Sequence, residues 1–489
     1  MAESREELDV LIVGAGLSGI GAAWAVQTGL PDLSYAVLEA REGVGGTWDL
    51  FRYPGIRSDS DMHTLGFSFR PWTDEKAFAD GPTIRRYVED TAAEFGIDRK
   101  IRFRHRLVAA DWRAAEARWI ATVEVGPERE RREIACRFLY LCTGYYDYAA
   151  GHQPTWPETD RFEGALVHPQ AWPQDLDWTD KRVLVIGSGA TAVTLIPAMA
   201  ERAAHVTMLQ RSPTYVVARP AKDPIAARLR AALPRAAAHA LTRWKNVLLG
   251  MVFYNYARLR PGETKRTIAK LAREALGPDY DLRHFSPAYD PWDQRLCVAP
   301  DGDLFAAIRS GKASVETDEI ERFSPGGVVL KSGREIAADV IVSATGLKLL
   351  LGGGATLTLD GAPLGLSERL TYKGLMFDGV PNLAFAMGYT NASWTLKCEL
   401  SSRYVVRLLK EARRRGAAVI VPERDGPVRE EPAIGLSSGY VRRALDVLPK
   451  QGDRAPWRLH QNYLLDLVTL RFGRLQDRAI RFLTVREAA

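Results

Sequence analysis

Cysteine is scarce in this sequence: only four of the 489 residues are cysteines, at positions 136, 142, 297 and 398, and none forms a C-x-x-C pair. So few cysteines exclude a disulfide framework, and their spacing argues against a bound metal and against a dithiol reductase. Cys136 and Cys142 flank the apolar run 138–141, so we expect buried, reduced thiols.

Long apolar segments are missing as well. No run reaches the roughly 18 apolar residues needed to span a bilayer. The first residues, MAESREE, are charged and lack the apolar core of a secretory signal, so we expect a protein of the reducing cytoplasm. Hydrophobic residues make up 46% and charged residues 26%, as in soluble globular proteins. A chain of this length is too long for one core and predicts two or three domains.

Positive charge is concentrated in one stretch. Between Arg219 and Glu274 there are 13 Lys and Arg against 3 acids, whereas the whole chain carries only +6. This stretch is rich in alanine, which predicts a helical insertion over 221–280. Its apolar run 247–254 could contact the anionic inner face of a membrane peripherally; the alternative is a helix packed on the body with a solvated basic face. No nucleic-acid-binding motif accompanies the charge, so we expect no nucleic-acid partner.

The first of two glycine-rich turns has the context of a dinucleotide-binding site. It follows the apolar run 8–13, precedes a predicted helix over 20–27, and contains Gly14, Gly16, Ser18 and Gly19. Glycines permit a tight turn, and the helix N-terminus faces a pyrophosphate. The next predicted strand, 35–38, ends at Glu39, where an acid can bind ribose hydroxyls. The alternative for Glu39 is a solvated strand end.

The second turn repeats this pattern with one difference. The strand 182–186 leads into Gly187, Ser188, Gly189, Ala190, Thr191, Ala192 and Val193. The following strand, 206–209, ends near Arg211 and Ser212 and has no acid there. An arginine suits the 2′-phosphate of NADPH, whereas Glu39 suits FAD; the alternative for Arg211 is an ordinary surface cation. Two nucleotides in one chain indicate electron transfer between cofactors.

The order of these patterns predicts an α/β fold with two Rossmann-like dinucleotide-binding domains and a helical insertion. Short strands ending at Gly144 and Gly346 return the chain to each sheet, and no third turn follows. We also predict a helix over 83–95 and strands around Phe103, over 119–125 and over 328–330. The predicted domains are an FAD-binding domain (1–150 and, with the C-terminal region, 346–489), an NADP-binding domain (151–220 and 281–345) and the insertion (221–280).

Several segments carry a family resemblance. The string Phe162-x-Gly164-x-x-x-His168-x-x-x-Trp172-Pro173 and the loop Gly45–Asp59 resemble signatures of Baeyer–Villiger monooxygenases, which are class B flavoprotein monooxygenases. Segments 290–296, 388–397 and 448–452 resemble the ethionamide-activating, thioamide-oxidising branch. The similarity extends over nearly the whole chain and is weakest in 221–280.

This resemblance implies a chemistry. NADPH would reduce FAD, and the reduced flavin would react with O2 to a C4a-peroxyflavin that converts apolar ketones to esters or lactones and also oxygenates thioethers or thioamides. An anionic intermediate needs a fixed cation and exclusion of water. By resemblance, that cation is Arg295, and Asp59 holds it; the alternative for Arg295 is a structural ion pair.

The resemblance also implies binding residues. For FAD these are Ser18, Glu39, Thr47, Trp48, Asp49, Leu50, Asp59 and Leu107. Arg57 and Ser58 would reach the NADP site, while His168 and Trp172 would link the domains. Many relatives carry a lysine directly before the catalytic arginine; here that residue is Gln294, which leaves Arg211 as the main cation for the 2′-phosphate.

Two other functions stay open on sequence grounds. One is a flavin monooxygenase restricted to nitrogen or sulfur, which Trp172-Pro173 disfavours. The other is a non-catalytic NADPH or flavin redox sensor, which the presence of Asp59 and Arg295 disfavours.

Overall fold

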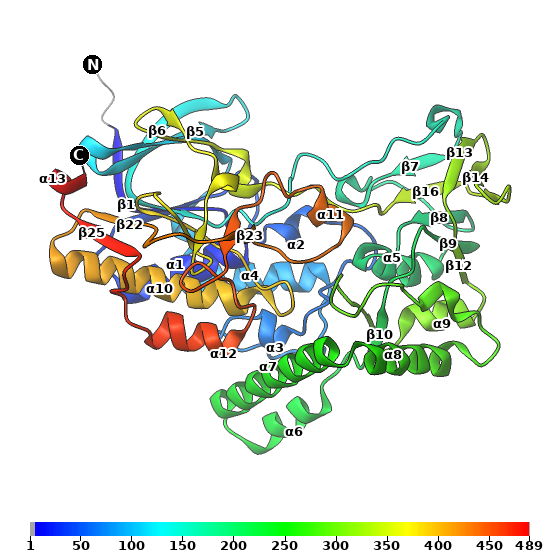
Figure 1. Cartoon of the computed structure of the whole chain (residues 1–489). Helices are drawn as coiled ribbons and strands as arrows, with labels where there is room; N and C mark the ends of the chain where they lie inside the picture. The colour runs from blue at the N-terminus through cyan, green and yellow to red at the C-terminus, as the bar shows by residue number, and fades with distance from the viewer. Residues whose placement is uncertain (1–4, 489) are drawn as a thin grey trace.

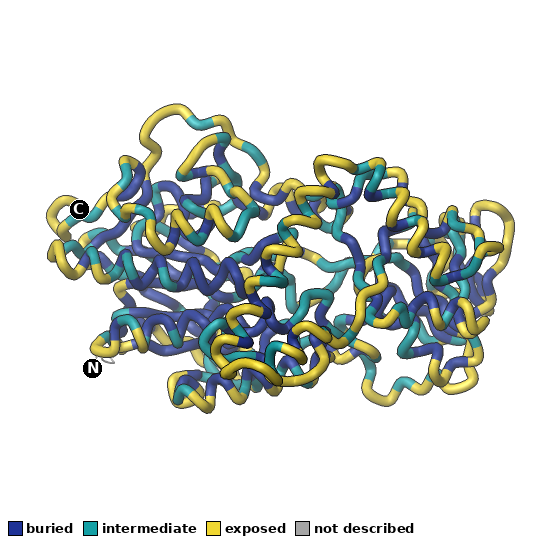
Figure 2. The backbone as a smooth tube through the Cα atoms, turned by 90° about the horizontal axis from the view of Figure 1, so that it is seen from below, coloured by how far each residue is buried: buried dark blue, intermediate teal, exposed yellow. Residues whose placement is uncertain are grey.

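The computed structural model describes residues 5–488, and Figure 1 shows two sheet-containing parts side by side, with a long helix beneath them. Buried segments run through the interior of both parts, and exposed loops lie at their margins (Figure 2). An α/β fold with two Rossmann-like sheets and a helical insertion is therefore confirmed.

The larger sheet has eleven strands built around β1, whose residues Val10, Leu11 and Ile12 are inaccessible to solvent. β1 pairs in parallel with β2 on one side and β6 on the other. Helix α1 follows β1 after a short turn, as the glycine pattern predicts. The bounds of its N-terminal elements are β1 Glu6–Val13, α1 Leu17–Gly29, β2 Tyr35–Leu38, α2 Thr47–Leu50, α3 Met62–Leu65, α4 Gly81–Glu94, β3 Ile101–Arg102, β4 His105–Arg113, β5 Arg118–Val125 and β6 Glu130–Leu141.

The chain beyond residue 346 returns to this sheet. β17 pairs in parallel with β4, and β21 pairs in parallel with β6. The predicted domain boundaries stay a prediction. They require the C-terminal residues to rejoin the sheet of the N-terminal residues, and the β17–β4 and β21–β6 pairings are of that kind. The elements are β17 Thr356–Leu359, β18 Ala362–Pro363, β19 Thr371–Tyr372, β20 Met376–Phe377, β21 Leu383–Phe385, α10 Trp394–Arg415, β22 Val419–Pro422, β23 Glu430–Pro432, α11 Gly439–Arg442, β24 Lys450–Gly452, α12 Tyr463–Asp466, β25 Ile480–Leu483 and α13 Val485–Ala488.

The smaller sheet has five parallel strands in the order β12-β9-β8-β16-β7. Its apolar strand β8 is followed by the second glycine turn and then by α5. The bounds of these strands and their helices are β7 Ala165–Val167, β8 Arg182–Ile186, α5 Ala190–Ala200, β9 His205–Gln210, α9 Asp303–Arg309, β12 Ala313–Thr317 and β16 Val340–Ser343. A separate antiparallel sheet consists of β13 Ile320–Ser324, β14 Gly327–Leu330 and β15 Glu335–Ala337.

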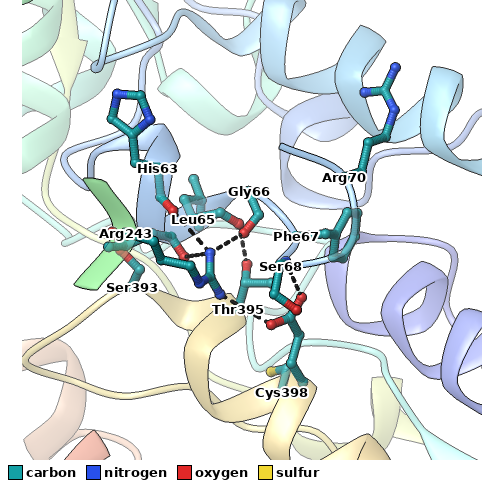
Figure 3. A network of polar contacts seen from close by, with 12 residues as sticks. His63, Leu65, Gly66, Phe67, Ser68, Arg70, Arg243, Ser393, Thr395 and Cys398 are labelled. Carbon is teal, nitrogen blue, oxygen red and sulfur yellow. Dashed lines mark hydrogen bonds and ion pairs between the residues drawn. The ribbon is translucent and has the colours of Figure 1, made fainter. Parts of the chain in front are cut away.

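The insertion is helical and is closed at its base by two short parallel strands. Its elements are β10 Val216–Arg219, α6 Pro224–Ala232, α7 Arg235–Leu259, α8 Pro261–Leu276 and β11 Cys297–Pro300. The buried Arg243 of α7 anchors it to the larger part (Figure 3). Its guanidinium donates to the carbonyl oxygens of His63 (3.0 Å) and Gly66 (2.7 Å) and to the Glu399 carboxylate of α10 (3.1 Å).

Most predicted elements are confirmed, with ends that differ by a few residues. The segment predicted as strand around Phe103 consists of two strands, β3 and β4, and Phe103 itself lies in the turn between them. All four cysteines are buried and unpaired, as expected. Within residues 5–488, no helix is long and apolar enough to cross a membrane. The same residues contain no group of three or more His, Cys, Asp and Glu side chains that could hold a metal ion.

Candidate active site

A cavity of about 560 Å³ lies where the strands of the larger sheet end and where α5 of the smaller sheet begins. Residues from both glycine turns and from the loop 45–59 line this one cavity. The sequence-predicted residues that line it are Gly14, Gly16, Ser18, Glu39, Thr47, Trp48, Arg57, Ser58, Asp59, Leu107, Ala190, Thr191 and Arg295.

The first turn can be formed only by glycine at two of its positions. Gly14 has φ +104°, and a Cβ added there would lie 2.6 Å from the carbonyl oxygen of Cys142. A Cβ on Gly19 would lie 1.8 Å from the carbonyl oxygen of Gly14, so Gly19 supports the turn and does not line the cavity. Gly16 caps α1 without a side-chain hydrogen bond, which leaves the amide groups of the first helical turn for a ligand.

Glu39 is buried at the end of β2, so the alternative of a solvated strand end is wrong. Its carboxylate accepts hydrogen bonds from the backbone N–H groups of Ala15 (2.8 Å) and Arg41 (2.9 Å). Burial raises the pKa of Glu39, and these two hydrogen bonds act in the opposite direction. The acid is thus fixed beside the first turn before any ligand arrives.

The loop after Gly45 contributes Thr47 and Trp48 to the cavity, but not Asp49 or Leu50. The Asp49 side chain turns away because it holds three guanidinium groups, those of Arg41 (2.8 Å), Arg52 (3.1 Å) and Arg85 (3.3 Å). Leu50 packs against the core of the smaller part. These two predicted residues therefore shape the loop and do not face the cavity.

The second turn is more open. Gly187 has φ +133°, and a Cβ there would lie 2.3 Å from the carbonyl oxygen of Ala344, whereas Gly189 is exposed and has nothing near its Cβ position. Ala192 and Val193 are buried in the core beneath the turn. The residues of this motif that do not line the cavity are Gly187, Ser188, Gly189, Ala192, Val193, Arg211 and Ser212.

Arg211 and Ser212 are exposed beyond the end of β9, and Ser188 donates a hydrogen bond to the carbonyl oxygen of Ser212 (3.2 Å). A second cation stands near them: burial, followed by the charge of Arg211, lowers the pKa of Arg443. The pKa of the nearby Glu319 is lowered by its hydrogen bond to Lys331 (2.5 Å) and further by the charge of Arg211, so that carboxylate is already paired. Sequence reasoning missed Arg443, because it follows α11 some 230 residues further along the chain.

Arg295 lies directly before β11 and carries a buried Nε that has no hydrogen-bond partner within residues 5–488. Tyr145, followed by Tyr440, Tyr146 and Asp59, raises the pKa of Arg295 against the opposing effect of burial. Its charge is therefore permanent. Arg57 has its own partner, Asp303 of α9. An unpartnered cation at a cavity of this kind fits an anionic group of a ligand.

Aromatic residues that the sequence reasoning missed form another part of the lining. Tyr145 stacks on Trp394, with ring centroids 5.1 Å apart, and its hydroxyl lies 3.3 Å from that of Tyr146. The indole N–H of Trp394 donates to the Ser18 hydroxyl (2.8 Å), which ties this stack to the first turn. Tyr145 and Tyr146 could have been found in the sequence, because they come directly after the turn at Gly144 that follows β6.

Comparison with known proteins gives consistent results. Residues 8–229 match the model of the family described as flavin-binding monooxygenase-like. The chain is 53% identical over 480 residues to the FAD-containing monooxygenase EthA of Mycobacterium tuberculosis, covering 98% of both chains. It is 50% identical to EthA of Mycolicibacterium smegmatis over 99% of this chain and 98% of that one. The fold matches a steroid monooxygenase structure bound to NADP with a TM-score of 0.77 at 23% identity, over 98% of this chain and 100% of that one.

Proposed function

The chain belongs to the family of FAD-containing, flavin-binding monooxygenases, and from that premise we propose that it uses NADPH and O2 to convert apolar ketones to esters or lactones. One oxygen atom enters the substrate, the other leaves as water, and NADPH supplies the two electrons. We propose that the same site oxygenates the sulfur of thioethers or thioamides. The observation that carries the proposal is one cavity lined by the first glycine turn, by Ala190 and Thr191 directly after the second, and by Arg295.

The residues around the first turn fit FAD. The amide groups of the first turn of α1 can bind the pyrophosphate, and Glu39 can accept hydrogen bonds from ribose hydroxyls. Thr47, Trp48 and Leu107 line the same cavity and would contribute to holding FAD, and Ser18 accepts a hydrogen bond from the indole of Trp394. When bound, FAD accepts a hydride and then reduces O2; the protein's share is to position these groups.

The residues around the second turn fit NADPH. Arg211 and Arg443 are two exposed cations close enough for their charges to interact, and the nearby Glu319 is paired with Lys331, so the two arginines are a suitable pair for a 2′-phosphate. Arg443 can take the place of the lysine that Gln294 replaces. Thr191, Arg57 and Ser58 bring the same nucleotide toward the shared cavity.

Arg295 supplies the fixed positive charge for an anionic oxygen species. Its charge does not depend on pH in the working range, and the unpartnered Nε costs no existing hydrogen bond when a ligand arrives. Asp59 of the loop 45–59 lines the same cavity, and its negative charge favours the charged form of Arg295. The stacked rings of Tyr145 and Trp394 also line this cavity, and apolar ring surface of this kind favours exclusion of water.

Product analysis tests the proposal. Purified protein with NADPH would be incubated under ¹⁸O2 with a linear, a cyclic and an aryl ketone and with a thioether, and the products identified by mass spectrometry. An ester or lactone with one labelled oxygen supports ketone oxygenation. Labelled sulfoxide without any ester supports the restricted sulfur and nitrogen monooxygenase. Neither product, with NADPH bound but not oxidised, supports the redox sensor.

The outer face of α7 supports a second proposal, peripheral contact with an anionic membrane. Over its 25 residues α7 contains no acidic residue, and its exposed side carries large apolar side chains. They are Leu241, Trp244, Leu248, Leu249, Val252, Phe253, Tyr256 and Leu259. Arg243, Lys245 and Arg258 of α7 are paired with acids, whereas Arg235 is exposed at its start. The contact would therefore depend mainly on the apolar side chains, which can enter the interfacial region of a lipid layer.

Vesicle co-sedimentation tests this contact. The protein is expected to sediment with phosphatidylglycerol vesicles and to stay in solution with phosphatidylcholine vesicles. Val252→Glu, at a side chain 66% exposed in the middle of the face, should release it, whereas Val485→Glu in α13, 41% exposed, should not. Equal behaviour of the two variants would contradict the proposal.

A further inference from the structure

Tyr389 belongs to two environments at once. Its ring lines the cavity described above. It also packs in a small apolar cluster with Val247 of α7 and Leu396 of α10, to which Met251 and Tyr463 add from the side. The buried side chain of Tyr389 therefore lies between the cavity and the inner face of α7. The outer face of α7 is the exposed apolar surface described above.

A buried ion pair holds Tyr389 in this place. Its hydroxyl donates to Oδ2 of Asp466 (2.6 Å), and the ammonium of Lys397 donates to the same oxygen (2.8 Å). All three residues are buried. Burying two opposite charges costs desolvation energy, whereas burying apolar groups in their place does not. A buried ion pair therefore need not stabilise the fold. What the pair does fix is the position of the tyrosine ring.

Asp466 connects this position to the surface. It is the last residue of α12, and the same short helix exposes Leu464 and Leu465. The π-helical turn that follows, Leu467–Phe472, exposes Val468 and Phe472. α12 lies near α7 (Figure 1), and the rings of Tyr463 and Trp244 approach to 5.9 Å between centroids. The apolar face of α7 thus continues onto α12.

The charge on this continued face is one-sided. In α12 and the following π-helical turn the only acid is Asp466, which is buried and paired. Arg471 and Arg474 are exposed at its edge, and Arg471 lies over the Phe472 ring. We call the exposed apolar residues of α7 together with Leu464, Leu465, Val468 and Phe472 the α7–α12 face.

We propose that the α7–α12 face is the entrance through which an apolar substrate dissolved in an anionic lipid layer reaches the cavity, and that Tyr389, held by Asp466 and Lys397, is the positioning residue that closes this entrance. The inference rests on the proposed function and adds the substrate class: long-chain apolar compounds partitioned in lipid. α12 would contact lipid through Leu464 and Leu465, and its last residue, Asp466, holds the Tyr389 hydroxyl. A shift of α12 at the lipid surface would therefore move the Tyr389 ring.

Two ketones distinguish this entrance from a general effect. A long-chain ketone, 2-tridecanone, is supplied in phosphatidylglycerol vesicles, and water-soluble cyclohexanone is supplied in buffer. For Val252→Glu we expect kcat/KM for the vesicle-borne ketone to fall roughly tenfold, with cyclohexanone within about twofold, whereas Val485→Glu should change neither. An equal fall for both ketones, or none for either, would overturn the proposal.

The closing role of Tyr389 has its own test. Tyr389→Phe keeps the ring and removes the hydroxyl that Asp466 holds, so water gains access to the cavity and the hydrogen peroxide released per NADPH should rise severalfold. The chain offers a matched control in Tyr372→Phe, because the Tyr372 hydroxyl donates to Asp477 (2.7 Å), which is likewise paired with Lys373 (2.9 Å), outside the cavity lining. Equal peroxide release by both variants would remove the assignment.

A binding readout separates this proposal from the proposed function. A spin-labelled long-chain ketone carried in the same vesicles should quench flavin fluorescence in the wild-type holoenzyme and much less in Val252→Glu. If the wild type oxygenates no ketone, the proposed function fails, while the difference in quenching still supports the entrance. If quenching is equal in both proteins, the entrance is wrong even when ketone oxygenation is intact.

Discussion

The two glycine turns of this chain have the same sequence pattern and different surroundings. At the first turn, Gly14 and Gly19 are packed against backbone atoms, and Glu39 is buried and hydrogen bonded. At the second turn, Gly187 is packed against backbone as Gly14 is, but Gly189 has nothing near its Cβ position and Arg211 is exposed. One site is closed and formed in advance, and the other is open. This is the difference expected between a nucleotide that stays and a nucleotide that is exchanged in each cycle.

The largest expected effect comes from filling the closed turn. Gly14→Val places a β-branched side chain at φ +104° and 2.6 Å from the carbonyl oxygen of Cys142. We expect a loss of about 3 kcal/mol or more in the free energy of unfolding, together with loss of bound flavin. Thermal unfolding and the ratio of flavin absorbance to protein absorbance measure both. Gly189→Val introduces the same side chain at an exposed position of the second turn, where φ is −77° and nothing lies near the Cβ position. It should leave both values unchanged, and a similar loss there would contradict the explanation.

Removing the fixed cation separates the two half-reactions. Arg295→Ala should retain reduction of the flavin by NADPH and lower ester formation by about 10²- to 10³-fold, since charge stabilisation of this kind has that magnitude. Single-turnover reduction and product yield are measured on the same preparation. Normal ester yield from Arg295→Ala would show that this residue is a structural ion-pair partner.

The open site should discriminate by charge. Arg211→Ala removes one cation from the pair with Arg443, and a charged hydrogen bond lost at a phosphate raises the Michaelis constant for NADPH about tenfold to a hundredfold. The constant for NADH, which lacks the 2′-phosphate, should stay the same. Arg443→Ala should behave alike. Equal effects on NADPH and NADH would mean that neither arginine contacts the 2′-phosphate.

The smallest expected effect is a pH dependence of the protein without cofactor. Burial raises the pKa of Glu39 above its usual 4.5, so the folded form retains a proton that the unfolded chain releases. Stability should therefore decrease as pH rises from about 4.5 through the raised pKa, and level off above it. Melting temperatures across this range test the sign. Glu39→Gln should lack this dependence, and an unchanged pH slope in that variant would contradict it.

The first site could be predicted from the sequence better than the second, for a physical reason. Strand, turn, helix and Glu39 are consecutive in the chain, so local pattern places them together. Tyr145 and Trp394 line the cavity from distant segments of the chain, and Arg443 comes near Arg211 from another, so only the packed fold shows that they meet. Asp49 is a residue that the motif predicted wrongly as part of the cavity lining. Three neighbouring arginines pair with its carboxylate, so its side chain turns away from the cavity.

The contrast between a retained and an exchanged nucleotide can be measured directly. Purified protein is dialysed exhaustively, and NADPH is then added under anaerobic conditions while the visible absorbance is followed. We predict that one flavin per chain survives dialysis, that no nicotinamide nucleotide does, and that one equivalent of NADPH bleaches the flavin. Protein that emerges colourless, or that keeps its flavin but is not bleached by NADPH, would contradict the account.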